Sequence, residues 1–123
     1  MIKKLLVLSS LLLFFIACQR NEASPVIGKW EAIALTEEAI PLEVDLSKIQ
    51  FDFRPNGRYD FRSTLKYHEA GIYKTQSNYL FTTDTLNANA IEKMVKFEAI
   101  QNDTLLLIMK KENKERKITL IRK

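Results

Sequence analysis

The sequence predicts an all-β protein, in which an eight-stranded antiparallel up-and-down meander closes into a small barrel. The first observation is that apolar residues beyond Val26 recur with a period of two, which is typical of strands with one buried face. The second is that short clusters of turn-forming residues separate these runs, with no long helical pattern between them. Closing a meander into a barrel removes both exposed sheet edges.

Eight short runs are the expected strands, and each is bounded by residues that favour turns. They are residues 29–35, 49–54, 59–67, 71–75, 79–83, 92–100, 104–109 and 117–121. The run at 104–109 is apolar at every second position and between them, which predicts that this side of the barrel packs under another segment. The long connection over residues 36–47 is the candidate cover, and it could carry a helical turn.

The turn at residues 55–57, Pro-Asn-Gly, fixes the register of the second and third runs. A two-residue turn would set inward aromatic residues opposite outward charged ones. A three-residue loop instead places Phe53 opposite Tyr59 and Phe51 opposite Phe61, so both apolar faces coincide. Proline suits the second position of a type I turn, and the glycine suits the left-handed residue that completes the bulge.

The first 17 residues have the layout of a secretory signal peptide that is removed from the mature protein. Lys3 and Lys4 are followed by an apolar stretch over residues 5–17 that contains no charge. A transmembrane helix is the alternative, but spanning a bilayer takes roughly 20 apolar residues and this run is shorter.

The only cysteine, Cys18, directly follows this stretch, after Phe15, Ile16 and Ala17. The segment resembles the lipobox of bacterial lipoproteins, in which a small residue precedes a cysteine that is acylated and becomes the new N-terminus. The resemblance implies a membrane-lipid anchor at Cys18, a flexible tether over residues 18–25 and a folded domain over 26–123. Gln19 is not the acidic residue that retains some lipoproteins at the inner membrane, so the outer membrane of the cell envelope is favoured, in either leaflet.

The mature chain is close to neutral, but its charge is unevenly distributed. Of 19 basic residues Lys3 and Lys4 are removed, which leaves 17 against 15 acidic ones, a net charge of +2. Residues 110–123 carry seven basic residues and two acidic ones, a local charge of +5. This patch is interpreted either as a solvated hairpin or as a surface that meets anionic lipid headgroups. Nucleic acid is not an expected partner of an exported lipoprotein.

Gly28-Lys29-Trp30 at the start of the first strand, a long first connection and an eight-strand meander are similar to the lipocalin family, especially its short lipoprotein-borne domains. The resemblance spans residues 26–123. It implies that Trp30 packs at the closed end of the barrel, with the guanidinium of Arg122 over its ring as a cation–π pair. The Thr-Asp-Tyr turn of that family is absent; Asn102-Asp103-Thr104 is a loose echo of it.

No catalytic constellation was found, so an enzyme, a metal site and a cofactor are not expected. His68 is the only histidine and lies beside a turn, without the partners that metal or triad chemistry requires. The acidic residues of the 36–47 connection lack the spacing of a calcium loop, and solvation explains them. They are Glu37, Glu38, Glu43 and Asp45.

Two functional classes remain open. In the first, the inward aromatic residues line a cup for a small apolar ligand, and tyrosine hydroxyls fix its polar end. In the second, the same residues fill the barrel, and the protein acts on another envelope protein as an assembly factor or as an inhibitor of an exported enzyme. The inward aromatic set is Trp30, Phe51, Phe53, Tyr59, Phe61, Tyr67, Tyr73, Phe81 and Phe97.

Overall fold

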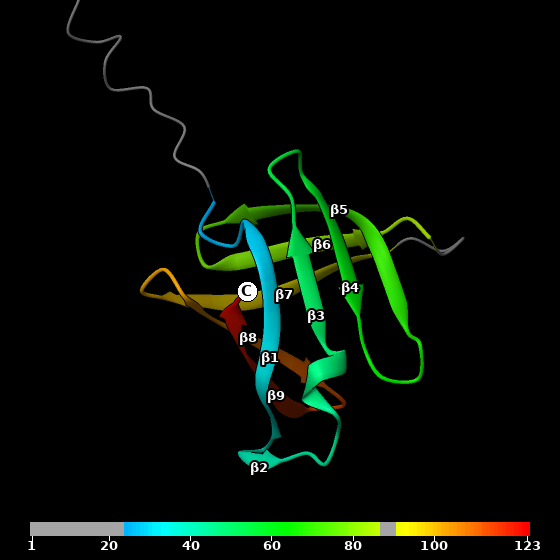
Figure 1. Ribbon diagram of the computed structural model, residues 1–123, viewed down its shortest axis with the longest axis vertical. Helices are drawn as coiled ribbons and strands as arrows, with labels where there is room; N and C mark the ends of the chain where they lie inside the picture. Colours follow the sequence, from blue (N-terminus) through cyan, green and yellow to red (C-terminus); the bar gives the residue numbers. More distant parts are fainter. Residues whose placement is uncertain (1–23, 87–90) are drawn as a thin grey trace, which may run out of the picture.

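The computed structural model describes residues 24–86 and 91–123, and it shows an all-β barrel (Figure 1). The expected signal peptide and Cys18 lie outside the described residues. No helix in the described part of the chain has the length and apolar character needed to cross a membrane. The elements are β1 (Gly28–Glu37), β2 (Ile40–Pro41), the 3-10 helix η3 (Leu46–Lys48), β3 (Gln50–Phe53), β4 (Arg58–Arg62), β5 (His68–Gln76), β6 (Tyr79–Asp84), β7 (Glu92–Ile100), β8 (Thr104–Lys111) and β9 (Lys114–Arg122).

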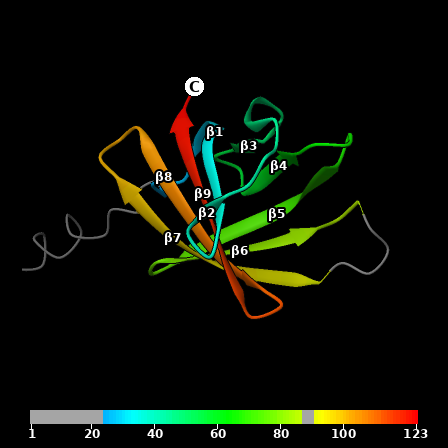
Figure 2. The same ribbon diagram turned by 90° about the horizontal axis from the view of Figure 1, so that it is seen from below.

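Eight antiparallel strands, β1 and β3 to β9, form the closed barrel that the sequence predicts. Each strand pairs with the next along the chain, and β9 returns to pair with β1. Figure 2 shows this closure, with β9 beside β1. The additional strand β2 is a two-residue arm that folds back on the end of β1.

The predicted hairpin between β3 and β4 is confirmed in its register. Phe53 pairs with Tyr59 and Phe51 with Phe61. The Arg54 amide donates to the Arg58 carbonyl at 2.9 Å, and Gly57 has a φ of +82°, which glycine adopts without a Cβ clash. The loop therefore has three residues, as the matching of apolar faces required.

The predicted continuous strand over residues 59–67 is wrong. β4 ends at Arg62, and the chain reverses through a turn in which the Tyr67 amide donates to the Thr64 carbonyl at 3.2 Å. The two central residues, Leu65 and Lys66, have φ values of 59° and 58°, the left-handed pair of a type I′ turn. Neither leucine nor lysine favours that conformation. The alternation of apolar residues therefore continues through the turn, and no turn-forming residue marks its two central positions.

The connection over residues 36–47 lies along β1 and does not provide the expected cover of β8. Its helical turn is present as η3, and the Leu42 amide donates to the Leu35 carbonyl at 2.9 Å. The outward residues Leu106 and Ile108 of β8 are instead half-buried among cross-strand neighbours, which for Ile108 are lysines of β7 and β9. The long aliphatic stems of lysine can cover such positions while their ammonium groups stay in water.

The end of the barrel at which β1 begins, called the closed end below, is filled by side chains. The Trp30 side chain is 1% exposed, and its indole Nε1 donates to the Val26 carbonyl at 2.8 Å. The guanidinium carbon of Arg122 lies 4.3 Å from the centre of the Trp30 ring, and its Nη1 donates to the Ile27 carbonyl at 2.6 Å. A Cβ at Gly28 would lie 2.2 Å from the same Nη1, so only glycine leaves room for this arginine.

The chain entering the barrel is also fixed at the closed end. Ser24 was expected to belong to a flexible tether, but its hydroxyl is hydrogen-bonded to that of Thr75 at 3.0 Å. The Ile27 amide donates to the Ser24 carbonyl, and Val26 is fully buried. Ser24 therefore belongs to the folded domain, and it lies at the closed end.

Candidate functional site

A cup of about 410 Å³ occupies the other half of the barrel interior, which we call the open end. All eight barrel strands contribute to its wall, because inward residues alternate along each strand. Most of the lining is apolar and comes from Leu35, Ile49, Phe51, Phe61, Leu80, Val95, Leu107, Met109 and Ile118. A volume in this range suits a small ligand.

The structure divides the predicted aromatic set between the two ends. Phe51, Tyr59, Phe61 and Tyr67 line the cup, and the rings of Phe51 and Phe61 stack at 4.4 Å. The others, apart from Phe81, pack at the closed end or against its core, so they fill the barrel instead of lining a cavity. They are Trp30, Phe53, Tyr73 and Phe97.

Phe81 lies on the outer face, and its assignment to the inward set is wrong. On β6 the buried positions are Leu80, Thr82 and Asp84, which leaves Phe81 facing out. Its ring packs under the ammonium of Lys74 at 5.3 Å. Leu80 and Phe81 are adjacent large apolar residues that point to opposite faces of β6. Alternation alone therefore did not decide which of the two faces inward.

A buried carboxylate in the cup wall accepts hydrogen bonds from three side chains. Glu69 Oε1 accepts from the Tyr59 hydroxyl at 2.6 Å, and Oε2 accepts from the Tyr67 hydroxyl at 2.8 Å and from Lys93 Nζ at 3.1 Å. The Glu69 side chain is only 6% exposed. Such a buried charge is tolerated because it is paired and hydrogen-bonded.

The cluster also holds protons on its two phenols. Burial, followed by the hydrogen bond to Glu69, raises the pKa of Tyr59 far above its ordinary value. The hydrogen bond to Glu69, followed by burial, raises the pKa of Tyr67 to about 12. Both tyrosines therefore remain neutral donors at physiological pH.

Sequence reasoning missed Glu69, Thr82 and Lys93 as residues of the interior. Glu69 has the same strand parity as Gly71 and Tyr73, but the expected strand began only at residue 71. Extending the expected strand by two residues toward the N-terminus would have placed Glu69 on its inward face. Gly71 itself marks a close approach of β5 and β6, since a Cβ there would lie 1.9 Å from the Thr83 carbonyl oxygen.

Three basic side chains, Lys93, Lys111 and Arg116, belong to the cup lining. Lys93 pairs with Glu69, and Arg116 Nε lies 3.3 Å from Glu37 Oε1. Lys111, at the end of β8, has no carboxylate partner among the residues that the structure describes. The basic run noted at residues 110–123 thus begins at the open end, on the β8–β9 hairpin.

Several acidic residues of the 36–47 connection have specific roles and are not merely solvated. Glu37 pairs with Arg116, and Glu38 accepts from the Glu115 amide at 2.8 Å. Asp45 caps η3 by accepting from the Ser47 hydroxyl and amide, and these hydrogen bonds lower the pKa of Asp45. Together they anchor the connection to the open end.

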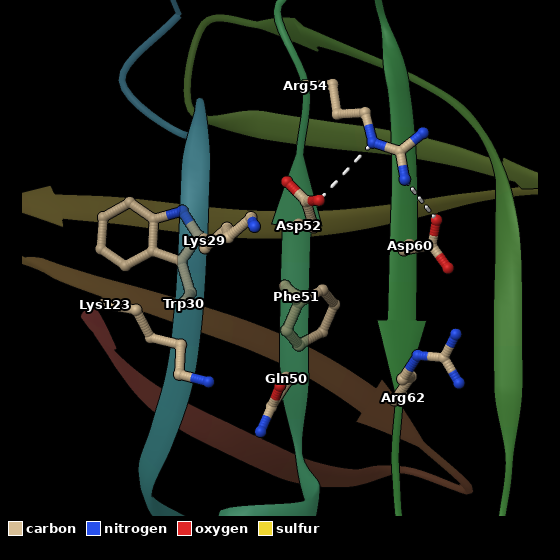
Figure 3. Close-up of a pocket in the computed structure, with 9 residues that line it drawn as sticks. All are labelled: Lys29, Trp30, Gln50, Phe51, Asp52, Arg54, Asp60, Arg62 and Lys123. Atoms are coloured by element: carbon tan, nitrogen blue, oxygen red, sulfur yellow. Dashed lines mark hydrogen bonds and ion pairs between the residues drawn. The ribbon is translucent and has the colours of Figure 1, made fainter.

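A second hollow, of about 320 Å³, lies on the outer face of β1, β3 and β4 and is mainly charged. Figure 3 shows Arg54 between the carboxylates of Asp52 and Asp60, at 3.5 and 3.0 Å. Nε2 of His68 is hydrogen-bonded to the other oxygen of Asp60, so this histidine belongs to a surface ion-pair network. Because Asp52, Arg54 and Asp60 already pair with one another and the lining is mainly polar, this groove is a weaker site for an apolar ligand than the cup.

Comparisons with known proteins yielded no match: no family model, no curated protein and no solved structure is similar to this chain. Within residues 24–86 and 91–123, no group of three or more His, Cys, Asp or Glu side chains gathers in a way that could hold a metal ion. The geometry of the cup is therefore the main indication of function.

Proposed function

We propose that this chain is a lipid-anchored protein of the bacterial cell envelope whose lipocalin-like barrel binds a small, mainly apolar molecule without catalysis. The observation that carries the proposal is the cup of about 410 Å³, open at one end and lined largely by apolar side chains. A small eight-stranded barrel is either filled or holds one small ligand, and here only the closed half is filled. The Gly28, Trp30 and Arg122 arrangement supports the lipocalin-like part of the proposal.

Ser24, the first residue that the structure describes, lies at the closed end, opposite the mouth of the cup. Its hydroxyl is hydrogen-bonded to that of Thr75, and Cys18 precedes it by six residues. A membrane anchor at Cys18 would therefore leave the mouth of the cup facing the aqueous compartment. Gln19 after the cysteine favours the outer membrane.

The binding function is tested by native mass spectrometry of the mature chain carrying Cys18→Ser, exported and purified from its own host. We expect a reproducible additional mass from a bound small molecule. Val95→Trp, which fills the cup, should abolish it, whereas Met94→Trp on the outer face of the same strand should not. A clean unliganded mass together with a captured envelope protein would favour the alternative, an assembly factor or an inhibitor of an exported enzyme.

The anchor is tested separately by metabolic labelling with an alkyne fatty acid. Wild-type protein should take up the label and Cys18→Ala should not. Label in the variant, or a wild-type protein that fractionates as soluble without label, would contradict the lipid anchor and leave an ordinary secretion signal.

A further inference from the structure

The basic end of the β8–β9 hairpin forms part of the cup, and it is not explained by an apolar ligand alone. The lining contains three cations, Lys93, Lys111 and Arg116, and one carboxylate, Glu69. On β8 the inward positions are Leu105, Leu107, Met109 and Lys111, so the row of apolar residues that lines the cup ends in an ammonium group at the mouth.

The three cations differ in how their charge is balanced. Lys93 is 3.1 Å from Glu69, and Arg116 is 3.3 Å from Glu37. Lys111 has no carboxylate partner in the described part of the chain, and its cross-strand neighbour is another cation, Lys114. The mouth therefore carries one ammonium group, that of Lys111, that forms no ion pair with a described carboxylate and that borders the apolar wall of the cup.

The buried Glu69 does not reverse this preference. Both of its oxygens already accept hydrogen bonds from Tyr59, Tyr67 or Lys93, and its side chain is almost completely covered. A cationic ligand would have to displace these protein donors to reach it, and the displaced groups would lose their partners.

We propose that the ligand is a small amphiphile whose apolar body occupies the cup and whose single anionic group lies at Lys111. This inference rests on the proposed binding function and adds the charge of the ligand and the residue that recognises it. At about 30 Å³ per water molecule in the liquid, 410 Å³ corresponds to roughly 13 water volumes, which matches a ligand of about a dozen non-hydrogen atoms.

The test compares three probes that share a ten-carbon chain: decanoate, decanol and decyltrimethylammonium. Isothermal titration calorimetry of the mature Cys18→Ser chain, with each probe below its micelle concentration, should show decanoate binding most tightly. Lys111→Gln should weaken decanoate about fivefold, the size expected for one partly exposed ion pair, and leave decanol unchanged. The difference between decanoate and decanol should shrink at high salt.

Lys110→Gln is the matched control, because Lys110 is the neighbouring lysine on the opposite face of β8. It should leave the affinities of all three probes unchanged. If decanol binds as tightly as decanoate, or decyltrimethylammonium binds best, the preference for an anion is wrong while the binding module stands. If no probe binds to the wild type, or Val95→Trp leaves decanoate and decanol affinities unchanged, the proposed cup function itself is contradicted.

Discussion

At the closed end of the barrel, side chains from every direction meet around Trp30, whereas at the open end the inward residues leave about 410 Å³ between them. The closed end is held by ring packing and by Arg122, which joins Trp30, Ile27 and Asn102. The open end is held by a polar cluster around Glu69 and by the ion pair between Glu37 of β1 and Arg116 of β9. One half of this small barrel is therefore a packed core, while the other half leaves the space in which we propose that a ligand binds.

The largest expected effect is on the closed end. Trp30→Ala removes a fully buried ring and should lower the free energy of unfolding by about 3 to 5 kcal/mol, a large fraction of the stability of a small domain. Phe61→Ala in the half-buried cup wall should cost clearly less, since less apolar surface is lost. Equilibrium urea unfolding measures both. A loss below about 1 kcal/mol for Trp30→Ala would show that the closed end does not dominate stability.

The two ends also differ in how much of them could be predicted from the sequence. The strand count and the Phe51–Phe61 register follow from alternation and from the Pro-Asn-Gly turn, because these signals are local. The place of Trp30 at the closed end was implied by the resemblance of Gly28-Lys29-Trp30 to a known motif. The polar part of the cup wall is built around Glu69. The burial of this carboxylate cannot be read from its own strand, because its donors Tyr59 and Lys93 come from β4 and β7. Local patterns do not encode such cross-strand partners.

The unexpected turn within residues 59–67 has a different cause. The tight turns at the open end place residue pairs without glycine at positive φ: Glu38 with Ala39, Leu65 with Lys66, and Glu112 with Asn113. Only Asn113 is a residue that favours this conformation. The sequence therefore indicates the loop at residues 55–57 clearly, whereas the reversal at Leu65 and Lys66, at the open end, has no sequence signal.

The Glu69 cluster provides the next largest effect. Tyr59→Phe leaves a buried carboxylate with one donor fewer and should cost about 1 to 3 kcal/mol. Tyr67→Phe removes a donor of the same type from a side chain that is 45% exposed, so water can replace it and the loss should be below about 1 kcal/mol. Urea unfolding of the two variants gives the comparison. Equal losses would mean that burial of the cluster does not control its contribution.

Alkaline pH should lower the free energy of unfolding, in part through the two tyrosines that donate to Glu69. The pKa values of Tyr59 and Tyr67 are raised in the folded protein above the ordinary value near 10, to about 12 for Tyr67. The folded state therefore holds these protons more tightly than the unfolded state does. The contribution of the two tyrosines to the free energy of unfolding is fully present below pH 10 and is lost as the pH rises from 10 toward 12. Urea unfolding at a series of pH values measures the decline, which should be shallower in Tyr59→Phe. An unchanged slope in that variant would exclude Tyr59 as its source.

The smallest expected effect is a gain in stability at the mouth of the cup. Leu65 is 98% exposed and, like Lys66, has a positive φ in the type I′ turn between β4 and β5. Asn-Gly is the preferred pair in this turn, so Leu65→Asn with Lys66→Gly should raise the free energy of unfolding by about 0.5 to 1 kcal/mol. Ligand affinity should stay the same, because neither residue belongs to the cup lining.

The control is Gly57→Ala at the closed end, where φ is +82° and a loss of about 1 kcal/mol is expected. A stabilised double variant with weakened binding would show that the strain in this turn serves the cup, and the separation between a stable end and a binding end would then have to include the turn.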